Sequence, residues 1–359
     1  MLTIDEQIEQ IEETLRKTPH HKATNGFIGA MRAKISRLKD KEIEQAGKKG
    51  GGGGGGYQVK KQGDATIVLV GPPSAGKSTL INLLTNAESK VAPYAFTTVT
   101  VVPGMLKHKE AYIQILDIPG LITGAREGKG RGKEVLSVAR GADLLIVMTD
   151  VKRVPLFESM VAELIGAGIR INEEPPKVLI EKKISGGLEV FSNIKQDIDK
   201  DTIKEIAREY GIKNGTITLQ ENVTMERLFD AFSENRVYIP TLWVINKIDE
   251  EPNYKEQIDG EYVAISAGNA KGIDKLIEKI WKALKFVTVY LVKPDEDIQR
   301  GDPIIMKEGD TLRDIALKIG PDFAESKKIV KIWGEGAKFP GQEVSFDTKV
   351  LDGMKVRFI

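Results

Sequence analysis

Short apolar runs alternate with amphipathic stretches along the central part of the chain. Five of these runs are rich in β-branched residues, and they fall at Thr66–Val70, Tyr112–Leu116, Leu144–Met148, Thr241–Ile245 and Tyr262–Ile265. Stretches with helical periodicity separate them, as in a sheet whose two faces are both covered by helices. The pattern therefore predicts an α/β core.

The first 49 residues follow a purely helical pattern. Apolar residues recur at helical spacing in two sets, which are Ile4, Ile8, Ile11 and Leu15, and then Phe27, Met31, Ile35 and Leu38. Thr3 and Glu6 form a capping box ahead of the first set. We therefore predict a helical hairpin over residues 1–49.

The second helix of this hairpin carries five basic residues, Arg32, Lys34, Arg37, Lys39 and Lys41. Residues 1–61 contain 12 basic against 8 acidic side chains, so this end of the chain is positively charged. Both a solvated helix face and a contact surface for nucleic acid or a partner fit this pattern. The alternatives stay open at this point.

Seven consecutive glycines, Gly50–Gly56, follow the hairpin. Each glycine loses maximal backbone entropy on folding and offers no side chain for packing. We interpret Ala46–Tyr57 as a linker, and we place the boundary between hairpin and core at residues 50–61.

The alternation of the core breaks between residues 175 and 235. Val178–Ile184 and Leu188–Phe191 flank Ser185-Gly186-Gly187 in the manner of a β-hairpin. Two helical segments follow, at Thr202–Tyr210 and Met225–Ser233. We predict an inserted α/β subdomain there, which divides the core into residues 62–174 and 236–286.

Residues 287–359 change the pattern again. A helix is expected at Thr311–Ile319, among short strands at Val287–Leu291, Ile329–Trp333 and Lys355–Ile359. The segment therefore predicts a separate β-rich domain of about 70 residues.

Composition narrows the class of protein. With 359 residues, the chain is long enough for two to four domains. Fifty-three Lys and Arg residues against 52 Asp and Glu residues exclude a protein that acts mainly as a polycation. The absence of cysteine excludes disulfides and thiolate catalysis and favours a reducing cytosol. No apolar run of 18 residues occurs, so we expect a protein without a membrane span.

The first apolar run is followed by a phosphate-binding motif, G-x-x-x-x-G-K-[ST]. Its residues are Gly71, Pro72, Pro73, Ser74, Ala75, Gly76, Lys77 and Ser78, and Thr79 begins a predicted helix. The glycines let successive backbone N–H groups point into one concavity, and the helix N-terminus adds positive charge. Lys77 can reach the β- and γ-phosphates, and the Ser78 hydroxyl can ligate Mg²⁺.

The second run ends in Asp117-Ile-Pro-Gly120. An Asp at the end of a strand beside the phosphate loop can hold Mg²⁺, and the Gly120 N–H can sense the γ-phosphate. A switch loop also needs a threonine that meets Mg²⁺ when the γ-phosphate is present. Thr97 and Thr98 both fit this role, and we favour Thr98. Lys77, Thr98, Asp117 and Gly120 are thus the candidate catalytic residues, with Ser78, Thr98 and Asp117 as metal ligands.

The fourth run ends in Asn246-Lys247-Ile248-Asp249. The Asp249 carboxylate can accept two hydrogen bonds from guanine, a pattern that adenine cannot supply. Asn246 would brace the loop, and the stem of Lys247 would lie over the base. After the last run, Ser266 and Ala267 can offer a backbone N–H to guanine O6. Four motifs in this order predict a site for GTP or GDP.

These residues resemble the developmentally regulated GTP-binding (DRG) proteins, a branch of the Obg-related GTPases, in an archaeal-like form. The segments that carry the resemblance are Gly71–Thr79, Phe96–Thr98, Asp117–Leu121, Gly124–Lys133, Asn235–Pro240 and Asn246–Asp249. The resemblance covers nearly the whole chain. It implies a P-loop GTPase core with a small inserted α/β domain, and a C-terminal TGS domain, a β-grasp module.

The resemblance also implies a cellular role. It implies a cytoplasmic, Mg²⁺-dependent GTPase switch that acts on ribosomes or RNA, with a dedicated stabilising partner protein. We expect a monomer. The competing function is a scaffold that binds RNA or the ribosome, is stabilised by nucleotide and has negligible turnover.

The hydrolytic machinery has a gap. Many GTPases orient the attacking water with a glutamine just after D-x-x-G, but Leu121 stands there. We therefore expect slow intrinsic turnover, assisted by K⁺, the ribosome or a partner, although Ser74 replaces the asparagine of K⁺-assisted relatives. Arg126, Lys129, Arg131 and Lys133 lie among four glycines, which fits either an internal arginine finger or a basic switch loop that a partner orders.

Overall fold

The computed structural model describes residues 2–21, 24–48, 63–85, 92–93, 100–118, 131–251, 262–293 and 301–359. Some of the predicted features lie outside these residues. They are the glycine run Gly50–Gly56, the two switch threonines Thr97 and Thr98, Gly120, and the segment from Gly124 to Gly130.

A seven-stranded sheet forms the centre of the molecule. Its order is β12 (Tyr262–Ala264), β11 (Thr241–Asn246), β5 (Leu144–Asp150), β1 (Ala65–Val70), β4 (Ala111–Asp117), β3 (Thr100–His108) and β2 (Ala92–Pro93). The first five of these strands are parallel, and β3 and β2 are antiparallel additions at the edge. All five predicted strands are confirmed, while β2 and β3 were not anticipated.

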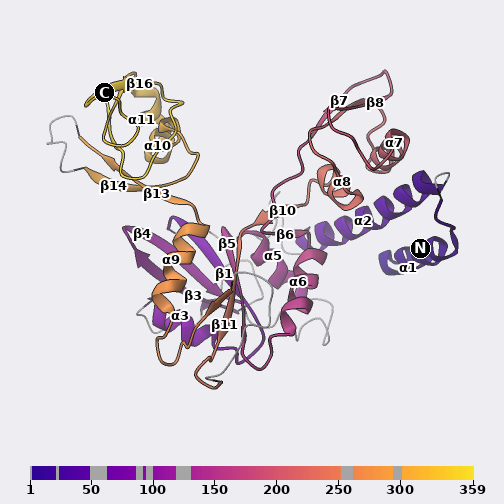
Figure 1. Ribbon diagram of the computed structural model, residues 1–359, viewed down its shortest axis with the longest axis horizontal. Coiled ribbons are helices and arrows are strands. Elements are labelled where there is room, and N and C mark those ends of the chain that lie inside the picture. The colour runs from indigo at the N-terminus through magenta and orange to yellow at the C-terminus, as the bar shows by residue number, and fades with distance from the viewer. Residues whose placement is uncertain are drawn as a thin grey trace.

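Helices cover both faces of this sheet, which confirms the α/β fold (Figure 1). On one face α3 (Lys77–Thr85) and α9 (Ile273–Ala283) pack against alternate residues of the strands. On the other face lie α5 (Arg131–Arg140) and α6 (Leu156–Gly166). Every residue of β1 and β5 is buried, because side chains on both faces meet a helix layer.

The N-terminal residues form α1 (Ile4–Lys17) and α2 (Asn25–Lys48), and the capping box of Thr3 and Glu6 is present. Helix α2 runs through residues 46–48, so the linker does not begin at Ala46, as the sequence suggested. Helix α2 packs on α5 and on the helices of the insert. Gly29 makes this packing close, since a Cβ there would lie 3.0 Å from Thr202 Cγ2.

The insert contains β7 (Val178–Lys182), β8 (Leu188–Ser192), β9 (Gly215–Leu219), α7 (Lys200–Glu209) and α8 (Met225–Phe232). Both helices are confirmed, but the predicted hairpin of β7 and β8 is wrong. The unforeseen strand β9 lies between them, antiparallel to β7 and parallel to β8. The Gly187 N–H donates to Asn214 Oδ1 and its carbonyl accepts from the Gly215 N–H, so β9 and not β7 holds the turn.

The insert joins the core through a short parallel pair, β6 (Ile169–Ile171) and β10 (Val237–Ile239). Its hydrophobic cluster takes in Ala33 of α2. The N-terminal helix and the insert therefore share one core, although nearly 150 residues separate them in the sequence.

The C-terminal residues form a five-stranded sheet in the order β14 (Asp302–Lys307), β13 (Phe286–Leu291), β17 (Lys355–Phe358), β15 (Val330–Trp333) and β16 (Gln342–Val344). The predicted helix is confirmed as α10 (Leu312–Ile319), which has Thr311 as its N-cap and packs on this sheet, and α11 (Pro321–Ser326) follows. The strands β14 and β16 and the helix α11 were not anticipated.

This C-terminal unit is attached to the core by apolar and ionic contacts. Ile305 joins the cluster beneath α9, and the Lys307 ammonium lies 3.1 Å from Asp143. Figure 1 shows the C-terminal unit and the insert on different sides of the core. Within the described ranges, no helix is both long and apolar enough to cross a bilayer.

Candidate functional site

The phosphate loop lies between β1 and α3 and takes a conformation that requires its glycines. A Cβ at Gly71 would lie 2.2 Å from the Met148 carbonyl oxygen, and one at Gly76 would lie 2.2 Å from Asn246 Nδ2. Gly76 has a φ of 93°, and Ser74 also has a positive φ, 59°. Close backbone approach and left-handed geometry therefore exclude side chains at both glycines.

The carbonyls of this loop are held by side-chain donors. Lys77 Nζ donates to the carbonyls of Gly71 and Pro72, both at 3.1 Å. Asn246 Nδ2 donates to the Ala75 carbonyl at 2.8 Å. Carbonyls held in this way cannot turn toward an anion, which favours a concavity lined by N–H groups.

Lys77 is buried at the start of α3. Burial lowers the pKa of its ammonium, and the Asp117 carboxylate 3.8 Å away opposes this effect. A polyphosphate in the loop would add negative charge beside Lys77 and stabilise its charged form. The side chain is thus placed to bind phosphate at neutral pH.

Asp117 and Ser78 form the candidate metal position. The Ser78 hydroxyl donates to Asp117 Oδ2 at 2.8 Å. The other carboxylate oxygen, Oδ1, is buried and accepts no hydrogen bond from the described residues. A hard cation such as Mg²⁺ prefers this set of oxygen donors, completed by phosphate and water. The residues present therefore fit Mg²⁺.

The guanine end of the site is organised by Asn246, which is buried at the end of β11. Besides holding Ala75, its Oδ1 accepts the Ala267 N–H at 2.9 Å. One side chain therefore links the phosphate loop to the loop after β12. Lys247 follows with a φ of 60°, which turns the chain sharply.

Asp249 is exposed at the rim of this loop. The Ser266 hydroxyl, the largest influence, lowers the pKa of the Asp249 carboxyl and keeps it ionised as an acceptor. The backbone N–H groups of Ser266 and Ala267 are already bonded, to the Lys271 carbonyl and to Asn246 respectively. Both N–H groups thus have partners within the protein, and their predicted contact with guanine O6 stays a prediction; the two residues also help to position Asn246 and Asp249.

The sequence motifs missed Arg153. Its Nη1 donates to the Pro73 carbonyl at 3.0 Å, and its Nε and Nη2 donate to Asp150 Oδ2 at 2.9 and 2.6 Å. Asp150 is buried at the end of β5, in register with Asn246. Arg153 is thus a third side chain that fixes the phosphate loop. The sequence feature that could have indicated this role is the segment Asp150–Arg153, in which three of the four side chains are charged and which comes at the end of an apolar strand.

Lys152 connects this segment to the guanine loop, because its ammonium lies 2.7 Å from Glu250. The structure therefore brings together Gly71–Thr79, Asp117, Asn246, Lys247, Asp249, Ser266 and Ala267 along the carboxyl ends of the parallel strands. Thr98 and Gly120 lie outside the described residues.

A parallel α/β sheet with a phosphate loop after its first strand and Asn-Lys-x-Asp after a later one defines the class of P-loop GTP-binding proteins. Comparison with known proteins agrees. The family described as "50S ribosome-binding GTPase" matches residues 66–183, its C-terminal region matches residues 185–286, and the TGS domain matches residues 287–359.

Three full-length relatives narrow the class to one family. An uncharacterized GTP-binding protein of Methanocaldococcus jannaschii is 45% identical over 98% of this chain and 92% of its own length. Developmentally-regulated GTP-binding protein 1 of Xenopus laevis is 39% identical over 96% of both chains, and Developmentally-regulated G-protein 3 of Arabidopsis thaliana is 38% identical over 100% of this chain and 99% of its own. The chain belongs to the family of developmentally regulated GTP-binding proteins.

Proposed function

We propose that this protein hydrolyses GTP to GDP and phosphate with Mg²⁺ and works as a molecular switch on ribosomes. The observation that carries the proposal is the joint placement of Lys77, Ser78 and Asp117. Phosphoryl transfer needs three groups: a buried lysine, a hydroxyl, and a carboxylate with an oxygen that accepts no hydrogen bond from the described residues. A site that only stabilises the fold has no use for all three.

Phosphoryl transfer depends mainly on positioning and on neutralising charge in the transition state. The loop N–H groups from Ser74 to Ser78 hold the phosphates in line for attack by water. Lys77 stabilises the charge that develops between the β- and γ-phosphates. Ser78 and Asp117 would hold Mg²⁺, which when bound would supply Lewis-acid stabilisation of the phosphate charge. Thr98 and Gly120 complete the proposed set as sensors of the γ-phosphate.

Guanine selection is assigned to Asp249, with the stem of Lys247 over the base. Asn246 keeps the guanine loop and the phosphate loop at a fixed separation through its two hydrogen bonds. This arrangement supports a preference for GTP over ATP, because an unpaired carboxylate would remain with adenine.

Intrinsic turnover is proposed to be slow, because Leu121 cannot orient water. K⁺ is a candidate activator, although Ser74 offers only a hydroxyl near the phosphates. The ribosome or a stabilising partner protein is the other source of activation. The ribosome-binding GTPase family that the core matches, the TGS domain and the lysines Lys327, Lys328 and Lys331 support contact with ribosomal RNA.

The proposal includes the organisation of the chain and its setting. The hairpin (1–49), linker (50–61), core (62–174 and 236–286), insert (175–235) and TGS unit (287–359) form one monomer in the cytoplasm. The separate hydrophobic clusters of the insert and the C-terminal unit support this division.

Single-turnover hydrolysis of GTP tests the proposal against the scaffold alternative. Wild-type protein should release phosphate in Mg²⁺ and stop when EDTA is added, and Lys77→Ala should be at least about 100-fold slower. Lys275→Ala on α9 serves as a surface control. Equal rates for wild type and Lys77→Ala would leave the scaffold as the better description.

Two further measurements address activation. Turnover in K⁺ and Na⁺ buffers should differ if K⁺ assists, and identical rates exclude this role. Ribosomes should accelerate the wild type, and a Lys328→Glu, Lys331→Glu double variant should lose the acceleration while keeping its basal rate. Unchanged acceleration would place the ribosome contact elsewhere on the protein.

A further inference from the structure

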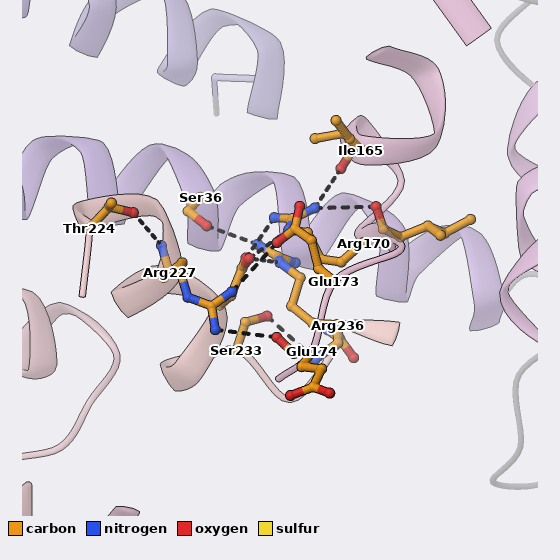
Figure 2. Close-up of polar contacts among 12 residues, drawn as sticks. Ser36, Ile165, Arg170, Glu173, Glu174, Thr224, Arg227, Ser233 and Arg236 are labelled. Atoms are coloured by element: carbon orange, nitrogen blue, oxygen red, sulfur yellow. Dashed lines mark hydrogen bonds and ion pairs between the residues drawn. The ribbon is translucent and has the colours of Figure 1, made fainter. Parts of the chain in front are cut away.

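A cleft of about 480 Å³ opens where α2, the end of α6 and α8 meet. Figure 2 shows the guanidinium groups of Arg170 and Arg236 close together beside Ser36 of α2. Both arginines line the cleft, and neither belongs to any motif of the guanine site. A volume of this size accommodates a ligand as large as a nucleotide.

The floor of the cleft is an ionic cluster. Arg170 grips Asp230 with two hydrogen bonds of 2.5 and 2.6 Å, and Arg236 Nε donates to the same carboxylate at 2.7 Å. Arg236 also pairs with Asp40, which accepts the Ser233 hydroxyl at 2.8 Å. We call Asp40, Arg170, Asp230 and Arg236 the junction cluster. Its two carboxylates balance its two guanidinium groups.

A third guanidinium group, that of Arg140, lies near the junction cluster. Arg140, at the end of α5, donates to the carbonyls of Ala167 and Asn235 at 2.6 and 2.7 Å. No carboxylate in the described part of the chain forms an ion pair with it. A Cβ on Gly168, which lines the cleft, would lie 2.9 Å from Arg140 Nη1 and 3.3 Å from Arg236 Nη1. The guanidinium groups of Arg140 and Arg236 thus both lie close to Gly168.

Burial, the largest influence, and the nearby Arg236 lower the pKa of Arg140, and the Asp40 carboxylate opposes them. Arg140 adds positive charge behind the Gly168 wall of the cleft, which favours an anion there. Arg32 and Lys39 also line the cleft, and both are exposed and form no ion pair with the described residues. Outside the junction cluster, Glu226 is the one carboxylate among the lining residues.

Three apolar side chains also line the cleft. Ile35 of α2, Ile165 of α6 and Phe229 of α8 line it, and Ile165 is exposed. The positive charges of Arg32 and Lys39 beside these apolar side chains match a ligand with an anionic group and a flat apolar body. Guanidinium forks recognise phosphate through paired hydrogen bonds, and a nucleobase can pack on the apolar walls.

We propose that this cleft is a second nucleotide-binding site, which takes the phosphate of a nucleoside phosphate, free or within RNA, and holds α2, α6 and α8 together around it. The phosphate lies between Arg32 and Lys39 near the Gly168 wall, and the base lies toward Ile165 and Phe229. This site is independent of GTP hydrolysis.

Calorimetric titration with adenosine 3′,5′-bisphosphate tests the site, with the guanine site filled by GDP and Mg²⁺. Wild type should bind the probe, and an Arg32→Gln, Lys39→Gln double variant should bind at least about tenfold more weakly. The matched control is Lys34→Gln, Lys41→Gln, which removes two exposed cations from the same helix outside the cleft and should leave affinity unchanged. Absence of binding to wild type, or equal losses in the two variants, would overturn the proposal.

A steric variant gives a second, charge-neutral test. Gly166 lines the cleft, and no atom lies within 4 Å of the position of a Cβ there, so Gly166→Leu narrows the cleft without strain. It should also weaken the probe at least about tenfold, and full affinity would count against the site. All variants should keep wild-type GDP affinity, so failure here is separable from failure of the GTPase proposal.

A third arm separates the two sources of the phosphate. A pentameric oligoadenylate that binds about tenfold more tightly than the bisphosphate, with the same dependence on Arg32 and Lys39, assigns the site to RNA. Equal or weaker binding of the oligomer assigns it to a free nucleotide. Both results support the site, and failure of the bisphosphate to bind wild type rejects it.

Discussion

The nucleotide site and the junction cluster both bring charged groups together in the interior of the described structure, and they do so in opposite ways. At the nucleotide site the charges are left partly unsatisfied, since Asp117 Oδ1 accepts no hydrogen bond from the described residues and burial lowers the pKa of Lys77. In the junction cluster every carboxylate oxygen of Asp40 and Asp230 faces a donor.

The two regions therefore use their charged groups for different purposes. The unsatisfied groups at the nucleotide site can interact with phosphate and Mg²⁺, so their interactions contribute to the free energy of ligand binding. Satisfied groups in the junction cluster hold α2, β6, α8 and β10 together before any ligand arrives. One region is built for a ligand, and the other is built for the assembly of the fold.

Removal of a junction carboxylate should give the largest effect on stability. Asp230→Ala leaves Arg170 and Arg236 buried without their shared partner, which should cost about 3–5 kcal/mol in the local stability of α8. Amide hydrogen exchange of α8 and α2 measures the loss. Glu205→Ala, which breaks an exposed pair with Arg208, should cost less than about 1 kcal/mol, and equal protection in both variants would refute the contrast.

Removal of the guanine acceptor should give the next largest effect and should act on affinity alone. Asp249→Ala should lower the preference for GDP over ADP by about a hundredfold, because the hydrogen bonds to the guanine edge are lost. Fluorescence titration with both nucleotides measures the ratio. Exchange protection of α8 should stay at the wild-type level, and a drop there would show that the two regions are coupled.

Loss of the Arg153 contact should be smaller. Arg153→Ala frees the Pro73 carbonyl, which weakens the preorganisation of the phosphate loop, and should raise the Kd for GDP about tenfold. Lys152→Ala, its neighbour in the same segment, breaks only an exposed pair with Glu250 and should change the Kd less than about twofold. Similar values for the two variants would remove Arg153 from the site.

The smallest effect should come from the cap of α7, the insert helix that packs on α2. The Thr202 backbone N–H, the largest influence, lowers the pKa of Asp199 below 3.8. Because the folded pKa is the lower one, the cap stabilises the helix above pH 3.8, and this contribution is lost as pH falls through the folded pKa. Asp199→Ala should cost about 1 kcal/mol at pH 7.

Asp199→Asn provides the matched control, because asparagine also caps but does not titrate. In thermal unfolding between pH 3 and pH 7, the stabilities of the wild type and the alanine variant should converge at low pH. The stability of the asparagine variant should differ from that of the alanine variant by a constant amount. Parallel curves for wild type and the asparagine variant would exclude a charged cap. GDP affinity should be unchanged in both.

The nucleotide site was readable because its residues come in contiguous motifs. Gly71–Ser78 and Asn246–Asp249 each sit directly after an apolar strand, and parallel strands bring their carboxyl ends together. The guanine contact of the Ser266 and Ala267 N–H groups stays a prediction, and only the folded chain shows that Lys271 and Asn246 bond them. Arg153 was missed because its partner, Pro73, lies 80 residues away.

The sequence by itself determined the α/β core, the phosphate loop, the guanine motif and the family, because each depends on the local spacing of residue types. Tertiary structure decided the place of β9 between β7 and β8, the shared core of α2 and the insert, and the junction cluster. These features depend on pairings between segments up to about 200 residues apart, such as Asp40 with Arg236. Neither partner carries a local signature, so only packing brings them together.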